Sequence, residues 1–332
     1  MKHILCLLTL GCLWFTASSA AQLVMQQTIA LPGVTGKFDH FAVDEAEGRL
    51  FAAATGNHSV EVVNLVTGRT EQSIGGFGKP HGVAWISASR RLFVADGSKG
   101  ELDMLAGSPL RIVQRIPLSE DADDLVYDAD SKLLYVGHGG TNAANPAAIA
   151  VIRTENLTLV KDIPVASHPE ALEIDEKGSR IFANIADKGQ IVVIDTKTQE
   201  IKSTWELAGT KGNTPLAYDA VNDRLLVGCR APAKLVVLNA STGTEIASAS
   251  ANEGVDDLFY DPQMRHAYLI AGSGWVDSFA FSVDGRPQPL PSIPTVAGAK
   301  TGLFVQSKGR LLVGIPGVKS AAEIRIYARR EE

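Results

Sequence analysis

The chain has 332 residues, of which 45% are hydrophobic and 6% are aromatic, and it carries 31 glycines and a formal net charge of −6. This apolar content excludes a disordered chain, and the negative charge argues against nucleic acid as a partner, because phosphate binding needs an excess of Lys and Arg. Length alone would suggest two domains, but an internal repeat overrides that estimate.

Residues 1–20 have the pattern of an export signal. A basic start precedes an apolar stretch over 4–15, and small residues follow it. This stretch is shorter than the roughly 20 residues of a transmembrane helix, and no later segment reaches that length. We therefore expect a cleaved signal peptide, a single mature domain over 21–332, a periplasmic or extracellular location and no membrane span.

Two of the three cysteines lie in this leader, so no disulfide can form within one mature chain. Lipidation of Cys12 is not expected, because Thr9 stands where a lipoprotein signal has an aliphatic residue. Cys229 ends the apolar run over 225–229, and we expect it to be a small buried side chain.

A unit of about 42 residues repeats from Phe38 to the end of the chain. Each copy has an apolar strand, a turn with Asp or Gly, a second strand, a polar loop and a third strand rich in Val and Ile. The first core residue of each second strand marks the register, with spacings of 42, 42, 47, 44, 42 and 44. These seven anchors are Leu50, Leu92, Leu134, Ile181, Leu225, Ala267 and Leu311. A period in the forties with several short strands predicts the blades of a β-propeller.

A more polar fourth strand follows the third in each unit except the last, which stops at Tyr327. The segment 25–31 resembles the fourth strand over 113–118, so we expect it to pair with the last unit. Such pairing would remove two exposed strand edges. The prediction is an all-β, monomeric, seven-bladed β-propeller with four antiparallel strands per blade, closed by the N-terminal strand.

Two segments carry a family resemblance: SRIFANIADKGQIVVIDTKTQE from Ser179 and KLLYVGHGG from Lys132. With them the chain resembles the YVTN β-propeller repeat family over nearly all of its mature length. The resemblance implies the propeller fold. It leaves the function open, because propellers host binding, hydrolysis, lyase and redox activities on one scaffold.

Polar residues gather where each first strand begins, at the predicted mouth of the central channel. The residues eleven positions before the anchors are Asp39, His81, Asp123, Glu170, Thr214, Asp256 and Lys300. Their neighbours His40, Asp124, Asp257 and His168, with His138 and Arg230 after two second strands, enlarge this set. We take a ligand-binding set from it: Asp39, Asp124, His138, Arg230, Asp256, Asp257 and Lys300. The alternative is a rim that is merely solvated, since loops are polar in any case.

A divalent metal ion is the sharper possibility. The candidate ligands are His40, His81, Asp123, His168 and Glu170, since imidazole and carboxylate together suit zinc, iron, manganese or copper. The acid pairs at 123–124 and 256–257 could instead bind calcium or a cationic ligand. Because neighbours in a strand point to opposite faces, each pair should give one side chain to the channel.

Other acids and one loop have different expected roles. Asp recurs in the turn after the first strand, where it should cap the turn by accepting backbone N–H bonds; these residues are Asp44, Asp128, Asp175, Asp219 and Asp261. The loop over 137–146 could form a partial lid. There is no Gly-x-Ser-x-Gly elbow and no phosphate-loop or dinucleotide fingerprint.

Three functions remain open at this point. The first is an exported binding protein whose His, Asp and Glu side chains hold a small ligand, a metal or a protein at the channel mouth. The second is a metal-dependent lactonase, hydrolase or lyase. The third is a redox accessory protein or a protein that binds haem noncovalently, since no Cys-x-x-Cys-His motif is present.

Overall fold

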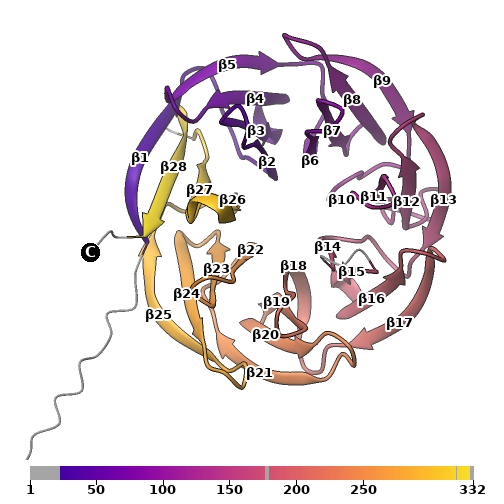
Figure 1. The fold of residues 1–332 in the computed structure, drawn as a ribbon, viewed down its shortest axis with the longest axis vertical. Coiled ribbons are helices and arrows are strands. Elements are labelled where there is room, and N and C mark those ends of the chain that lie inside the picture. Colours follow the sequence, from indigo (N-terminus) through magenta and orange to yellow (C-terminus); the bar gives the residue numbers. More distant parts are fainter. Residues whose placement is uncertain (1–22, 176–178, 319, 330–332) are drawn as a thin grey trace, which may run out of the picture.

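The structure is a computed structural model, which describes residues 23–175, 179–318 and 320–329. The expected signal peptide over 1–20 lies outside these residues. Seven four-stranded antiparallel sheets form a ring in which each sheet is one blade (Figure 1). The prediction of a seven-bladed β-propeller is thus confirmed, and three short 3-10 helices are the only helices in the described parts.

In each of the first six blades the strands follow in chain order from the axis to the rim. Blade one has β2 (Phe41–Asp44), β3 (Arg49–Ala54), β4 (Ser59–Asn64) and β5 (Arg69–Ile74). Blade two has β6 (Pro80–Ile86), β7 (Arg91–Asp96), β8 (Glu101–Ala106) and β9 (Arg111–Pro117). Blade three has β10 (Leu125–Asp128), β11 (Leu133–His138), β12 (Ala148–Arg153) and β13 (Thr158–Pro164).

The next three blades repeat this order. Blade four has β14 (Leu172–Ile174), β15 (Arg180–Ile185), β16 (Gln190–Asp195) and β17 (Glu200–Glu206). Blade five has β18 (Lys211–Asp219), β19 (Arg224–Ala231), β20 (Ala233–Asn239) and β21 (Glu245–Ser250). Blade six has β22 (Val255–Asp261), β23 (His266–Ala271), β24 (Trp275–Phe281) and β25 (Pro287–Pro294). The 3-10 helices are η1 (Thr55–Asn57), η2 (Ala186–Lys188) and η3 (Gln306–Lys308).

Blade seven combines both ends of the chain. It has β26 (Gly302–Val305), β27 (Arg310–Ile315) and β28 (Ala322–Arg329), and its outer strand is β1 (Leu23–Leu31). β1 pairs antiparallel with β28, from Leu23 opposite Arg329 to Leu31 opposite Ala322 (Figure 1). The predicted closure is confirmed, and the segment 25–31 forms most of the closing strand.

The core lies between neighbouring blades. All seven anchors are fully buried in the second strands, where β-branched and aliphatic side chains face the adjacent sheets. Cys229 is also fully buried, as predicted. None of the helices in the described residues is long and apolar enough to cross a membrane.

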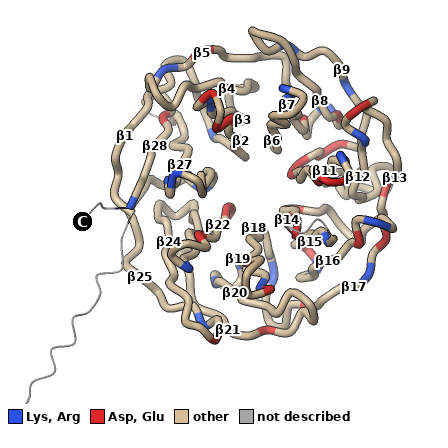
Figure 2. The backbone as a smooth tube through the Cα atoms, in the orientation of Figure 1, with Lys and Arg blue, Asp and Glu red and all other residues tan. Residues whose placement is uncertain are grey.

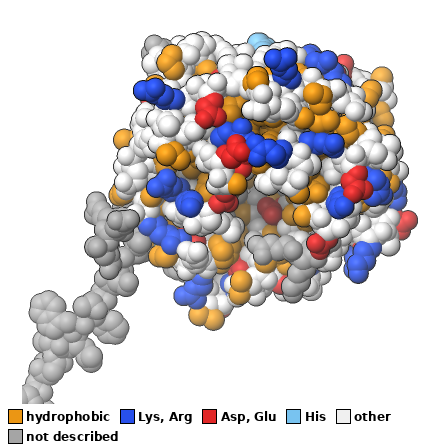
Figure 3. All heavy atoms as spheres, turned by 45° about the horizontal axis from the view of Figure 1, so that its top comes forward, with side chains coloured by type: hydrophobic (Ala, Val, Ile, Leu, Met, Phe, Trp, Pro, Cys, Tyr) orange, Lys and Arg blue, Asp and Glu red, His pale blue; other side chains and the backbone are white. Residues whose placement is uncertain are grey.

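The acids that recur in the first turn have the predicted structural role. Asp44, Asp128, Asp219 and Asp261 accept backbone N–H bonds two or three residues on, at 3.0 to 3.4 Å. Asp175 accepts bonds from the side chains of Ser179 and Arg180. Charged residues of both signs occur all round the ring, and one face shows them interspersed with hydrophobic side chains (Figures 2 and 3).

Candidate functional site: the mouth of the central channel

A cavity of about 170 Å³ opens where the seven inner strands begin. One residue from each blade lines it, and these seven are the residues eleven positions before the anchors: Asp39, His81, Asp123, Glu170, Thr214, Asp256 and Lys300. The other lining residues are Lys37, His40, Ala171 and Arg230. The repeat register therefore brings together side chains that lie up to 261 positions apart in the sequence, from Asp39 to Lys300.

Backbone pairing at the start of each blade sets the direction of these side chains. The Asp39 N–H donates to Ala53 O at 2.8 Å, and the Ala53 N–H donates to His40 O at 3.1 Å. Asp123 and Asp124 make the equivalent pair of bonds with Gly137, at 2.9 and 3.0 Å. Because direction alternates along an extended backbone, the two residues of each pair point different ways; Asp39 and Asp123 line the cavity, as does His40, whereas Asp124 does not.

In two blades the second residue binds the next blade. Asp124 Oδ2 accepts the backbone N–H of Leu172, in blade four, at 2.7 Å. Asp257 Oδ2 accepts the backbone N–H of Gly302, in blade seven, at 2.7 Å. Asp124 and Asp257 therefore join neighbouring blades and do not line the cavity, so each acid pair gives it one side chain, as predicted.

His40 lies among carboxylates of blades one and six. Its Nδ1 is 3.5 Å from Asp257 Oδ1, and its Nε2 is 3.7 Å from Asp39 Oδ1. Burial opposes the charged imidazole, but the carboxylates of Asp124 and Asp257 outweigh burial and raise the pKa of His40 to about 10. The surrounding carboxylates therefore favour the charged form of the His40 ring.

Two more histidines alternate with carboxylates here: His81 lines the cavity, and His168 lies behind Asp123 without lining it. His81 Nδ1 lies 2.8 Å from Asp39 Oδ2 and 3.4 Å from Asp123 Oδ1. His168 Nε2 lies 3.4 Å from Asp123 Oδ2, and its Nδ1 lies 2.8 Å from Gly139 O. Burial opposes both charged rings, but hydrogen bonds to Asp39 and Asp123 prevail, raising the pKa of His81 and bringing that of His168 to about 9.

A glycine permits this arrangement. Gly82 follows His81 in β6, and a Cβ atom there would lie 2.3 Å from the carbonyl oxygen of Asp123. Any side chain at residue 82 would therefore push blade two away from blade three and separate His81 from Asp123.

The opposite wall is basic. Arg230 and Lys300 both pair with the carboxylate of Asp256, and Arg230 Nε also donates to Val255 O at 2.9 Å. Burial opposes the charge of Lys300, but Asp256 prevails and raises the pKa of its ammonium. The cations of this wall are thus held by a protein carboxylate.

Glu170 differs from the other acids of the cavity. Within the described parts of the chain, its carboxylate has neither a hydrogen bond nor an ion pair. Burial and then the charge of Asp123 raise the pKa of Glu170. The site therefore presents one carboxylate whose acceptor capacity no described protein group uses.

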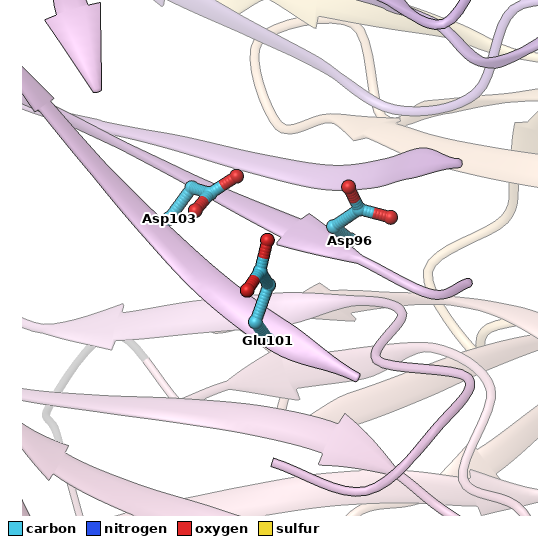
Figure 4. Close-up of side chains that lie close together, drawn as sticks. All are labelled: Asp96, Glu101 and Asp103. Carbon is cyan, nitrogen blue, oxygen red and sulfur yellow. The ribbon is translucent and has the colours of Figure 1, made fainter. Parts of the chain in front are cut away.

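The five candidate metal ligands do not form one compact ligand set. Among the described residues, the three-residue group whose ligand atoms lie within 4.8 Å of one another is Asp96, Glu101 and Asp103 in blade two (Figure 4). At the cavity, the imidazole nitrogens of His40 and His168 face protein acceptors. The Nε2 of His81 faces Gly97, where the Cβ of any larger residue would lie 2.9 Å from it.

The blade-two acids form an ion-pair network. Arg115 Nε lies 3.2 Å from both Glu101 Oε1 and Asp103 Oδ1, and Lys99 Nζ lies 3.6 Å from Glu101 Oε1. Asp103 is fully buried, and neither of its carboxylate oxygens accepts a hydrogen bond from a described group. Burial, followed by the charge of Glu101, raises the pKa of Asp103 to about 7. In the sequence, the one sign of this acidic group is that Asp103 interrupts the otherwise apolar run 102–105.

His138 and the long loop do not reach the cavity lining. The buried ring of His138 lies 3.1 Å from Asp162 Oδ1, in the outer strand of its own blade. In the loop over 137–146, the carbonyl oxygen of Gly139 lies next to Nδ1 of His168. A Cβ at Gly140 would lie 2.6 Å from the backbone nitrogen of His168, so this loop packs against the segment that leads into blade four. Lys37 and Ala171 line the cavity but are absent from the predicted set.

Comparison with known proteins supports the fold. No protein-family model matches the sequence, and comparison with curated proteins finds no match either. One similar solved chain belongs to the crystal structure of the mitotic checkpoint complex, with a TM-score of 0.79 and 13% identity over 100% of this chain and 99% of that one. Another belongs to the hydrazine synthase of Kuenenia stuttgartiensis, with a TM-score of 0.74 and 14% identity over 84% and 92%. At these identities the likeness shows a β-propeller.

Proposed function

We propose that this β-propeller is a binding protein whose central cavity holds a small molecule with an amino group. The observation that carries the proposal is the Glu170 carboxylate, which faces the cavity without a described protein partner. Glu170 is half-buried, and a charged donor from a ligand would form a charge-assisted hydrogen bond with its carboxylate.

Pairing within the cavity leaves Glu170 as a lining carboxylate without a described partner, whereas Asp39 and Asp256 are paired. Three of the cations that line the cavity are already paired, Arg230 and Lys300 with Asp256, and His81 with Asp39. An ammonium group between Glu170 and Asp123 would instead meet acceptors. The cavity volume of about 170 Å³ is below the roughly 300 Å³ at which pockets for drug-sized ligands begin, so the ligand is small.

The histidines support binding better than general-base catalysis. A general base must be neutral when it accepts a proton, whereas the carboxylates around His40, His81 and His168 raise the pKa of each imidazole. These rings act as donors that hold Asp39 and Asp123 in place.

Thermal unfolding and calorimetry of the purified full chain would test the proposal. The probes are methylamine, ethanolamine and glycine. Methanol is the uncharged control, and acetate is the anionic control. We expect an amine to raise the Tm and Glu170→Gln to weaken its binding at least tenfold, while Glu200→Gln, an exposed acid on β17, leaves binding unchanged.

Two results would overturn the proposal. The first is equal binding by Glu170→Gln and the unaltered chain. The second is stabilisation by zinc or manganese ions that is lost in His81→Ala and His168→Ala, which would favour the metal-dependent enzyme or redox alternatives.

We also propose that the mature chain is exported and begins near Ala21, on the strength of the leader pattern over 1–20. N-terminal sequencing of the protein from the periplasm or medium of an expressing bacterium should start near that residue. An uncleaved chain confined to the cytoplasm would contradict the proposal.

A further inference from the structure

One position of the inner strands holds an aromatic ring in most blades. It is the residue paired directly with the anchor, and across the seven blades it is Val43, Trp85, Tyr127, Ile174, Tyr218, Tyr260 and Phe304. Five of the seven are aromatic, and these rings fill the space between the inner ends of adjacent blades.

At two junctions an arginine directly before the anchor reaches this ring from the preceding blade. The guanidinium carbon of Arg49, in blade one, lies 5.5 Å from the ring centroid of Trp85, in blade two. That of Arg180, in blade four, lies 5.8 Å from the ring of Tyr218, in blade five. Arginine against an aromatic face is a favourable contact, so the ring and the cation together close these two junctions.

The junction between blades seven and one lacks the ring. Arg310 holds the position of Arg49 and Arg180, but the residue that it should meet in blade one is Val43. A cavity of about 390 Å³ lies there, with an apolar wall made of Val43, Leu65, Val305, Leu312 and Ile326. Its volume is within the range of about 300–1,000 Å³ typical of small-molecule sites.

The rim of this cavity is basic. Lys308 and Arg310 both line it, and within the described residues neither side chain forms a hydrogen bond or an ion pair. Glu45, the acid of the same cavity, is engaged by the hydroxyl of Ser307. The cavity therefore offers an apolar, ring-sized space next to two free cations.

We propose that this seam cavity binds an aromatic carboxylate. The ring of the ligand takes the place that Trp85 and Tyr218 fill at other junctions, stacked against Arg310, and its carboxylate pairs with Lys308. Lys308 and Arg310 outnumber the Glu45 carboxylate and favour an anionic group over an amine, and burial of the ring against Val43 and Leu65 supplies the apolar part of the binding energy. Because the cavity joins the blade built from both chain ends to blade one, the ligand also stabilises the closed ring.

Calorimetric titration of the full chain with benzoate and indole-3-acetate tests this proposal, with benzamide and benzylamine as the uncharged and cationic counterparts. We expect the carboxylates to bind and to raise the Tm, benzamide to bind at least tenfold more weakly, and benzylamine not to bind. The double variant Lys308→Gln, Arg310→Gln should lower carboxylate affinity to the level of benzamide, and Lys197→Gln, in an exposed turn, should not.

A filling variant tests the shape of the site separately. Val43→Trp should abolish binding of the carboxylates, while Ile174→Trp, the same change at the other non-aromatic position of the register, should preserve it. Glu170→Gln should leave this binding unchanged, because Glu170 lines the other cavity. Equal affinity for benzoate and benzylamine, or full binding by a folded Val43→Trp, would overturn the proposal; if Val43→Trp fails to fold, the double variant decides.

Discussion

The Nδ1 atom of His81 lies 2.8 Å from Oδ2 of Asp39, so a charged hydrogen bond links blade two to blade one at the wall of the central cavity. Burial disfavours both charges, yet each partner stabilises the other. The hydrogen bond from His81 and the charge of His40 hold the pKa of Asp39 well below its usual range, and Asp39 in turn raises the pKa of His81.

This pair predicts a pH dependence of stability. The pKa of His81 is higher in the folded than in the unfolded chain, so its contribution is complete below about pH 6.5 and is lost as the pH rises through the folded pKa. We expect His81→Ala to lower the free energy of unfolding by about 1.5–3 kcal/mol at pH 6, the range for a hydrogen bond to a charged group. Urea denaturation at pH 6 and pH 10 should show a smaller difference at pH 10, and the same difference at both would contradict this account.

The two blade clamps, Asp124 and Asp257, predict a different pattern. Asp124→Ala leaves the N–H groups of Leu125 and Leu172 without their acceptor, and Asp257→Ala does the same to Gly302. Each should cost about 1–3 kcal/mol, the penalty for an unsatisfied buried donor. Asp124→Asn and Asp257→Asn keep one carbonyl acceptor and should cost less. The urea midpoints of these variants check the prediction, with Asp130→Ala, at an exposed position, as the control. Equal midpoints for the Ala and Asn variants would contradict it.

The repeat allows the ring, its closure and the register of the cavity to be predicted. Each anchor is fully buried in a second strand, and the count of eleven residues back identifies one lining residue per blade. Both results depend on periodicity, which a single sequence displays directly.

The remaining features depend on contacts between blades, which periodicity does not specify. Alternation along the strand shows that Asp123 and Asp124 diverge, but only the packing of blade four shows that Asp124 meets the Leu172 N–H. The position of His138 at the end of a second strand predicts a ring at the mouth, yet the ring turns toward Asp162. The prediction misses Lys37 because this residue lies two positions before Asp39, the residue that the repeat register selects in blade one.

Replacing the buried Asp103 by a neutral residue should stabilise the fold at neutral and higher pH. Its pKa of about 7 in the folded chain exceeds the usual value near 3.9, so the unfolded chain releases this proton first and stability declines as the pH rises from about 4 to about 7. Asp103→Asn resembles the protonated acid. We expect it to match the unaltered chain near pH 4 and to have the higher Tm at pH 8. A lower Tm at pH 8 would show that the Arg115 ion pair outweighs the burial of the charge.

Ring closure depends on the apolar face of β1. Ile29 is 1% exposed and pairs with Ile324 of β28, in a core cluster that also contains Leu31, Leu50 and Leu312. Ile29→Ala should lower the free energy of unfolding by about 2–5 kcal/mol, as large-to-small substitutions in a core do. Gln26→Ala, an exposed change on the same strand, should have almost no effect. If chemical denaturation shows one cooperative transition in which Ile29→Ala shifts the midpoint for the whole ring, β1 is part of the global fold. A separate early transition that leaves the other blades intact would mean that the strand only covers an edge.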